Sequence, residues 1–448
     1  MDWETLLNPG RLCRPDYEEK PGRPAYLQDY DRILFSEPFR RLAQKTQVHP
    51  LYHHDHLHHR MIHSMETSSV GRSLGIQVGQ RLVDKALLAE GQQHTMAGIV
   101  QAACLMHDIG NPPFGHSGED AIGEWFAAQF RAGTGLAAGV PQAQQSEFIR
   151  FEGNAQGFRI AASLEMGRQS GGMQLSHATL GAFMKYPCTA RAGLKKNDAY
   201  VGRKKFGVFE TEATLFAETA VALGLPQEGE GASRWWRRHP LAFLVEAADD
   251  ICYRILDLED AATIGDLPTD QVIEILERIA PSKRPAEPGM TAHEIVALRR
   301  AMAIGAAIGA AVDAFMDNYA AIMDGSFNGD LMGMSSKAGV FAELENISNA
   351  RIFTARRKTE LEIAGRQVLH DLLDHFHALY TELKAEGWDA EALQARQDYW
   401  AKLIRATDLD LRDVTDDYTA LHALADYVSG MTDRYAVRMR DMIAGRTG

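Results

Sequence analysis

The sequence predicts an all-α protein, and three observations support this. Apolar residues recur three and four positions apart over most of the chain, as they do on one face of a helix. The chain shows no internal repeat and no alternation of strands with helices of the kind that builds a parallel sheet. After a candidate linker at 281–289, the remaining residues are typical of long helices, at 292–323, 365–383, 390–406 and 418–427.

The composition is that of a globular protein with a large core. Hydrophobic residues make up 45% and charged residues 24% of the 448 residues, as in ordinary globular chains. The net charge of −13 argues against a general nucleic-acid coat. Four scattered cysteines favour a reducing cytoplasm and exclude a zinc ribbon. We expect no signal peptide, and the apolar stretch 301–312 is shorter than the roughly 20 residues of a membrane span.

The chain divides into three expected parts. Residues 1–30 are polar and contain prolines, so we expect an extended lead-in. Residues 31–280 are expected to form the functional core, and 291–448 a helical region packed on it. Inside the core we expect helices at 31–47, 60–82, 97–106, from 117 onward and at 241–258, and a broken helix over 158–194. We expect loops at 131–146 and 224–233, and a short hairpin within 195–216.

The pair His107–Asp108 ends the apolar run 97–106. Asn111, Pro112 and Pro113 follow, and proline cannot continue a helix because it lacks a donor and clashes with the preceding turn. Two side chains that can bind metal are thereby expected at the end of a rigid element, which suits a metal site.

A second group of polar residues lies on helix 241–258, which Pro240 opens. Asp249, Tyr253 and Asp257 lie four positions apart and form a polar stripe beside the apolar face. A carboxylate buried there must be paired or metal-bound, although Asp249 read alone could equally be an exposed residue. Two imidazoles and two carboxylates would suit a divalent transition metal with open positions; the candidates are His63, His107, Asp108 and Asp249.

Several motifs occur in order between about Arg32 and Tyr435. They are Arg60-x-x-His63-Ser64, His107-Asp108-x-Gly110-x-Pro-Pro-Phe-Gly-His116, Phe151-Glu-Gly-Asn-Ala-Gln156, Lys185-Tyr-Pro187, Lys205-Phe-Gly-Val-Phe-Glu210, Ala248-Asp249-Asp250-Ile-x-Tyr253 and Asp426-Tyr-x-x-Gly-Met-Thr-Asp433. Together they resemble the HD-domain superfamily and, within it, the bacterial dGTPase type of deoxynucleoside triphosphate triphosphohydrolase. The resemblance implies an HD helical core at 31–280 with additional C-terminal helices.

The resemblance also implies roles for individual residues. It implies one divalent metal per chain (Mn, Mg, Ni, Fe or Zn), held by His63, His107, Asp108 and Asp249. His116 and Glu119 would be the catalytic acid/base dyad, at a helix start that favours an anion; the alternative is that His116 only caps this helix. The implied phosphate contacts are Arg60, Asn154, Lys185, Tyr186 and Lys205.

Two further residues would read the sugar. Tyr253 would pack under the deoxyribose, unless it is simply a core tyrosine, and Gln47 would meet the 3′-hydroxyl. Similar proteins often have an arginine where this chain has His422, which bears on base recognition. The histidine run 53–59 is expected to begin in a solvated loop.

The expected reaction is metal-dependent hydrolysis of a deoxynucleoside triphosphate, dGTP or several dNTPs, at the α-phosphorus, giving the deoxynucleoside and inorganic triphosphate. Two alternatives stay open: another HD chemistry, such as a 5′-nucleotidase or guanosine-tetraphosphate hydrolase, and an HD protein that binds nucleotides or single-stranded DNA without turnover. The expected partners are a dNTP, with a nucleotide effector and weak single-stranded DNA left open, and no membrane. A homo-oligomer, a hexamer by analogy, would use helix 292–323 as a candidate interface.

Overall fold

The computed structural model describes residues 1–47, 59–193, 200–281, 289–352 and 356–446. The prediction of an all-α protein is confirmed, because helices make up almost all of the regular structure in these ranges. The one sheet among them is the antiparallel pair of β1 (Gln227–Glu228) and β2 (Trp235–Trp236).

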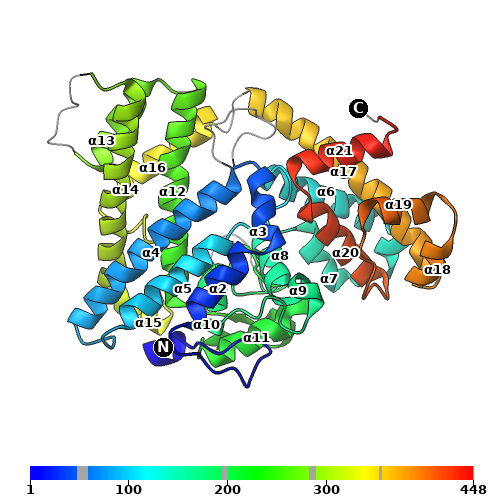
Figure 1. Cartoon of the computed structure of the whole chain (residues 1–448), viewed down its shortest axis with the longest axis horizontal. Helices are drawn as coiled ribbons and strands as arrows, with labels where there is room; N and C mark the ends of the chain where they lie inside the picture. The colour runs from blue at the N-terminus through cyan, green and yellow to red at the C-terminus, as the bar shows by residue number, and fades with distance from the viewer. Residues whose placement is uncertain (48–58, 194–199, 282–288, 353–355, 447–448) are drawn as a thin grey trace.

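The helices follow one another along the chain as shown in Figure 1. The first group is α1 (Trp3–Leu6), α2 (Ala25–Leu34), α3 (Glu37–Arg41), η1 (Leu42–Gln44), α4 (Arg60–Asp84), α5 (Gln92–Met106) and α6 (His116–Ala132). The second is η2 (Gly135–Gly139), α7 (Gln142–Ile149), α8 (Gly153–Arg159), η3 (Ile160–Leu164), α9 (Glu165–Arg168), α10 (His177–Phe183), η4 (Val201–Arg203), η5 (Glu210–Glu212), α11 (Ala213–Ala222), η6 (Gly231–Ser233) and α12 (Pro240–Ile264). The third is α13 (Thr269–Ile279), α14 (Ala292–Asp317), α15 (Tyr319–Asp324), α16 (Ala338–Ile347), η7 (Ser348–Ile352), α17 (Arg356–Ala385), α18 (Ala390–Ala395), α19 (Tyr399–Thr407), α20 (Asp417–Gly430) and α21 (Asp433–Ile443).

The antiparallel pair α4 and α5 lies at the centre of the fold. Glycines four positions apart on α4 let the two backbones approach closely. A Cβ at Gly75 would lie 2.7 Å from Cα of Ala97, and a Cβ at Gly79 would lie 2.8 Å from Cα of Gln93. Because the helices run in opposite directions at this short separation, the start of α4 lies beside the end of α5.

The long helix α12 packs across this pair. Its apolar positions Leu244, Ala248, Ile251 and Ile255 are fully buried, as the sequence predicts. Pro240 is its first residue, also as predicted. On its other sides α12 contacts α10 and α14, so it joins the N-terminal helices to the later ones on the left of Figure 1.

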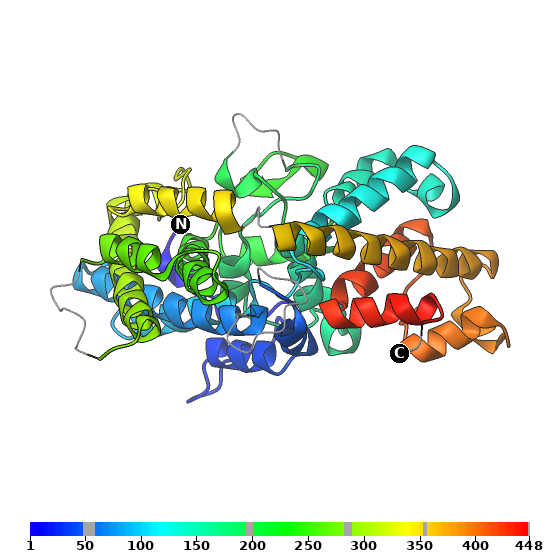
Figure 2. The same ribbon diagram turned by 90° about the horizontal axis from the view of Figure 1, so that it is seen from above.

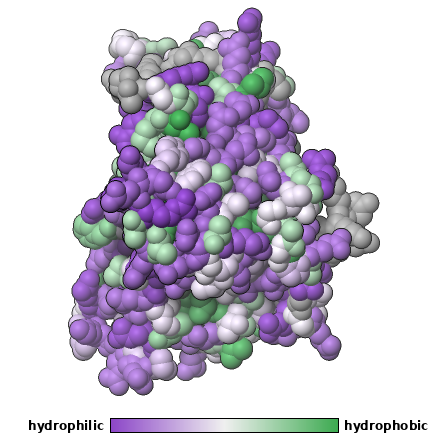
Figure 3. All heavy atoms as spheres, turned by 90° about the vertical axis from the view of Figure 1, so that its right-hand side faces the viewer, coloured by the Kyte–Doolittle hydropathy of each residue, from purple (hydrophilic) through white to green (hydrophobic). Residues whose placement is uncertain are grey.

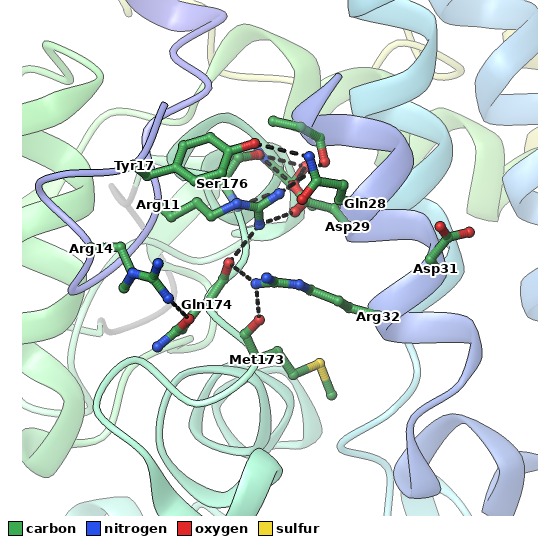
Figure 4. A network of polar contacts seen from close by, with 12 residues as sticks. Arg11, Arg14, Tyr17, Gln28, Asp29, Asp31, Arg32, Met173, Gln174 and Ser176 are labelled. Atoms are coloured by element: carbon green, nitrogen blue, oxygen red, sulfur yellow. Dashed lines mark hydrogen bonds and ion pairs between the residues drawn. The ribbon is translucent and has the colours of Figure 1, made fainter. Parts of the chain in front are cut away.

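The first 30 residues differ from the expected extended lead-in. They form α1 and the first half of α2, and their polar side chains hold them against the body (Figure 4). Arg11 and Asp29, which are 2% and 0% exposed, form an ion pair of 2.7 Å. Arg32 donates to the carbonyls of Met173 (2.7 Å) and Gln174 (2.6 Å). Most residues between 14 and 23 are exposed, but the buried pair of Arg11 and Asp29 fixes the segment to the body of the protein.

Other expected elements are shifted or divided. The helix expected at 31–47 breaks at Ser36, whose side chain caps α3. The loop at 131–146 contains η2 and part of α7. The described part of 195–216 has no strand pair, and the hairpin lies later, in β1 and β2, where a loop was expected. The predictions for the loop at 53–58, for residues 195–199 and for most of the linker at 281–289 fall outside the described residues.

The C-terminal helices lie on one side of the molecule (Figures 1 and 2). Helix α17 packs against α6, α20 and α21 and so joins them to the core. The face that they form is mostly hydrophilic, with apolar side chains in small groups (Figure 3). In the described ranges one helix, α14, is long and apolar enough to cross a membrane. It packs against α4, α12 and α13.

Candidate active site

All thirteen candidate residues line one cavity of about 140 Å³. The walls come from the starts of α4, α6 and α8, the end of α5, the middle of α12 and the segments after α10 and η4. The candidates are Gln47, Arg60, His63, His107, Asp108, His116, Glu119, Asn154, Lys185, Tyr186, Lys205, Asp249 and Tyr253. Residues up to 206 positions apart in sequence thus meet at one place.

Three potential metal ligands form the floor of this cavity. Nε2 of His63 lies 3.1 Å and Nε2 of His107 lies 3.5 Å from the same oxygen, Oδ1 of Asp249. One ligand atom from each residue lies within 4.8 Å of the other two. The close pairing of α4 with α5 brings the histidines together, and α12 supplies the carboxylate.

The chemistry of His107 fits a cation at this point. Its Nδ1 lies 2.7 Å from the carbonyl of Cys104, which can only accept, so Nδ1 carries a proton. Its Nε2 is buried and has no hydrogen-bond partner among the residues that the structure describes. Burial alone would lower the pKa of His107, but Asp108 and Asp249 outweigh it and raise the pKa to about 9. The carboxylates therefore favour a positive charge at Nε2, and a divalent metal bound there in place of the proton would supply it.

Asp108 borders this trio and is held by other groups. Its Oδ2 accepts from Nη1 of Arg60 at 2.7 Å. Its Oδ1 accepts from Nδ2 of Asn111 and lies 3.6 Å from Nε2 of His107. Although burial opposes it, Arg60 and then His107 lower the pKa of Asp108 to about 2. Asp108 is therefore an ionised carboxylate at the edge of the three-ligand cluster.

His116 and Glu119 lie on the first turn of α6. The N-cap of this helix is Gly115, at a φ of +63°, so His116 does not cap it. Surrounding protein, together with Arg60 and Lys205, lowers the pKa of His116. Oε1 of Glu119 accepts from the backbone N–H of Gly153 at 2.7 Å. No hydrogen bond joins His116 to Glu119 among the described contacts, which differs from the expected dyad geometry.

Two lysines in the lining of the cavity each form an ion pair with a glutamate. Nζ of Lys205 lies 2.8 Å from Oε2 of Glu152, and Nζ of Lys185 lies 3.4 Å from Oε1 of Glu246. The other oxygen of Glu246 accepts from Nη1 of Arg238 at 2.7 Å. Both lysines have raised pKa values despite burial, which favours their neutral forms, because nearby acidic groups attract their protons. Both lysines are therefore protonated, and each is held by a buried glutamate.

A second cavity, of about 420 Å³, adjoins the first and shares Gln47, His116 and Tyr253 with it. Tyr253 is half-buried at this boundary, so it is a wall residue and not part of the core. Helix α17 contributes Glu362, whose Oε1 accepts from Oγ of Ser117 at 2.9 Å. The second, outer cavity can therefore hold one part of a ligand whose other part lies in the inner cavity.

Comparison with known proteins relates the sequence to one family. Residues 60–152 match the HD domain. A Pseudomonas aeruginosa protein called "Deoxyguanosinetriphosphate triphosphohydrolase-like protein" is 40% identical over 100% of this chain and 99% of its own length. A Synechocystis protein of the same name is 37% identical over 99% of both chains. The chain belongs to this triphosphohydrolase-like family. A Yersinia pseudotuberculosis protein called "Deoxyguanosinetriphosphate triphosphohydrolase" is 28% identical over 92% of each chain.

Membership of the triphosphohydrolase-like family makes the protein a phosphohydrolase of the HD type. Several pocket residues of this family member were not predicted from its sequence, chiefly Glu152, Glu246 and Asn111. Two of them carried a usable signal. Glu152 lies inside a family motif, and Glu246 precedes Asp249 by one helical turn on α12.

The position where similar triphosphohydrolases often have arginine lies away from both cavities. His422 is 2% exposed, and its Nε2 lies 3.2 Å from Oε1 of Glu147. Its ring packs 4.6 Å from that of Phe148. In this family member His422 therefore helps to join α20 to α7.

Proposed function

We propose that the protein hydrolyses a deoxynucleoside triphosphate, dGTP or several dNTPs, to the deoxynucleoside and inorganic triphosphate. The observation that carries this proposal is one cavity that has a cluster of potential metal-ligand side chains together with Arg60, Lys185 and Lys205 in its lining. The adjoining outer cavity would take the sugar and base. The name of the Pseudomonas relative supports the same reaction class.

The metal would be one divalent ion per chain, held by His63, His107 and Asp249, with Asp108 as a fourth ligand. Such an ion supplies Lewis-acid polarisation of a phosphoryl oxygen and acidifies a water molecule. Arg60 shares Asp108, and its charge lies where an α-phosphate beside these ligands would need neutralisation.

The remaining phosphates would lie along Lys185, Tyr186, Asn154 and Lys205. Charge-assisted contacts of this kind favour the transition state when they are fixed beforehand. His116, at the start of α6, would transfer a proton at the water or at the 5′-oxygen. Its lowered pKa keeps it neutral near pH 7 and therefore able to accept one. Glu119 would orient the ring of His116 once substrate closes the gap between them.

Tyr253 and Gln47 would bind the sugar, because both lie where the two cavities join. A half-buried ring at this wall would collide with a 2′-hydroxyl. We also propose that the protein forms homo-oligomers. On α14, a Cβ at Gly305 or Gly309 would have no neighbour within 4 Å in the described part of the chain, so this face would be available for a second helix.

The deciding experiment incubates the purified protein with each of the four dNTPs and Mn²⁺ or Mg²⁺ and separates the products. Inorganic triphosphate and deoxynucleoside in equal amounts are expected, and none from the Asp249→Ala variant. Release of phosphate from a monophosphate, or of pyrophosphate from guanosine tetraphosphate, would favour the other HD chemistries. Nucleotide or DNA binding with no product in any arm would overturn the proposal.

A further inference from the structure

Glu119 and Glu152 share one lysine at the wall of the cavity. Nζ of Lys205 lies 2.8 Å from Oε2 of Glu152 and 3.7 Å from Oε2 of Glu119. The side chains of Glu152 and Glu119 are 5% and 9% exposed, whereas that of Lys205 is 41% exposed. One cation thus serves two buried carboxylates, and of the three groups it has the most access to the space where a phosphate would bind.

Glu152 also holds a second pocket residue. Its Oε1 accepts from Nδ2 of Asn154 at 2.7 Å and from the backbone N–H of Asn154 at 3.4 Å, as the N-cap of α8. The start of α8 packs directly against the backbone at Gly110. Glycine permits this contact, because a Cβ there would lie 2.1 Å from the carbonyl oxygen of Gly153. Glu152 therefore has a rigid support and binds two side chains that line the cavity.

We propose that Glu152 is a positioning residue for the hydrolytic reaction, which holds Lys205 and Asn154 ready for the triphosphate and keeps a proton on the neighbouring Glu119. The positioning part rests on the proposed function. The proton-holding part concerns the protein alone and can be tested without a substrate.

The electrostatics of Glu119 support the second part. The charged groups that face it are Arg60 from α4, Glu152 at the start of α8, and Lys205 after η4; His116 precedes it on its own helix. Burial and then the charge of Glu152 raise the pKa of Glu119 to about 8, although Lys205 opposes this. Two buried carboxylates beside a single lysine favour the state in which only one is ionised.

Binding of a triphosphate would strengthen this effect. A phosphate oxygen competes with both glutamates for Nζ of Lys205, and the lysine is exposed enough to respond. As the cation moves away, the pKa of Glu119 should rise further, because Lys205 lowers it. The same movement would link the arrival of substrate to the protonation state of the group beside His116.

The kinetic test measures the pH dependence of kcat/KM for dNTP hydrolysis in three variants. Glu152→Gln removes a negative charge, so the limb of the profile that reports Glu119 should move to lower pH by about one unit. Lys205→Gln removes a positive charge and should move the same limb to higher pH. Both should raise KM. Glu147→Gln removes a buried glutamate outside the pocket and should change neither quantity.

The second measurement needs no substrate and compares thermal midpoints at pH 5.5 and pH 8. Native Glu119 keeps its proton up to about pH 8, whereas the unfolded chain releases it near 4.5. The native state thus binds more protons between these values, and stability from this source falls as pH rises. The fall should be smaller in Glu152→Gln than in wild type or Glu147→Gln.

These outcomes separate the two claims. The proton-holding role is wrong if Glu152→Gln leaves both the pH profile of kcat/KM and the fall in thermal midpoint between pH 5.5 and pH 8 unchanged. The positioning role is wrong if Glu152→Gln leaves KM unchanged. If the wild type hydrolyses no dNTP, the proposed function fails and the positioning role fails with it, while the midpoints still decide the proton-holding role. If Glu152→Gln does not fold, Glu152→Asp keeps the charge but shortens the reach, so KM should rise with the limb in place.

Discussion

Nε2 of His63 lies 3.1 Å from Oδ1 of Asp249, although the two residues are 186 positions apart in the chain. The contact exists because α12 packs across the start of α4. His107 approaches the same oxygen from the end of α5.

This contact predicts where the metal binds. Purified protein should carry close to one divalent transition metal per chain, and His63→Ala or Asp249→Ala should lose most of it, because each removes one ligand. Elemental analysis of the purified variants is the measurement. The matched control is His177→Ala, a buried histidine that contacts Thr219 outside the pocket and should leave the metal in place. Full metal retention in both pocket variants would remove these residues from the ligand set.

His116 and Glu119 should be needed for chemistry and not for metal binding, because neither lies in the ligand cluster. His116→Ala should lower kcat by a factor of roughly 10²–10⁴ with metal content and dNTP affinity near normal. Glu119→Gln can keep its bond from the N–H of Gly153 and should act in the same direction. Asp108→Asn should lose metal and activity together.

Single-turnover triphosphate release, equilibrium nucleotide binding and metal content are measured on the same variants. The dyad assignment is wrong if His116→Ala loses its metal or keeps wild-type turnover.

Tyr253 should discriminate against ribonucleotides. Its ring packs edge-on against that of His63, with the centroids 6.5 Å apart, so movement away from a 2′-hydroxyl would disturb a proposed metal ligand. We expect GTP to be a poor substrate beside dGTP, and Tyr253→Ala to narrow the difference in kcat/KM between them. A wild-type enzyme that hydrolyses both at the same rate would contradict this role.

The buried ion pair between Arg11 and Asp29 should stabilise the folded protein. Asp29 accepts from Arg11, from the N–H and Oγ of Ser176 and from Oγ1 of Thr179. Asp29→Ala leaves Arg11 buried without its partner and should lower the free energy of unfolding by about 3–5 kcal/mol. The exposed pair of Arg23 and Asp31 provides the control, since Asp31→Ala should cost less than about 1 kcal/mol. Urea denaturation of the two variants would measure this difference.

His239 should make the protein sensitive to acid. Its Nδ1 accepts from the N–H of Leu241 at 3.1 Å, and its Nε2 donates to the carbonyl of Leu6 at 3.0 Å, which together require a neutral ring. Burial lowers the pKa of His239 to about 4. The unfolded chain binds the proton near pH 6.5, so this stability is present above that pH and is lost as the pH falls towards 4.

The loss should amount to about 1–3 kcal/mol. Thermal midpoints at pH 7 and pH 5 should therefore differ less in His239→Gln than in the wild type. An equal difference in the two proteins would show that other groups cause the acid sensitivity.

The sequence by itself determined the helical class, the family and thirteen of the residues that line the pocket. Helix periodicity is local, so α4, α5 and α12 could be predicted from the spacing of their apolar residues. Motifs such as His107–Asp108 lie within a few positions, and their order along the chain is visible without coordinates.

The sequence did not determine which groups pair inside the pocket. Only the tertiary structure decided that Glu152 and Glu246 hold the two lysines, that Glu119 contacts Gly153 instead of His116, and that Arg11 is buried against Asp29. These contacts join segments that are distant in sequence, and a charged residue in a polar stretch reads the same whether it faces water or a buried partner. Burial depends on how the helices pack. The packing therefore decides whether such a charged residue faces water or a buried partner.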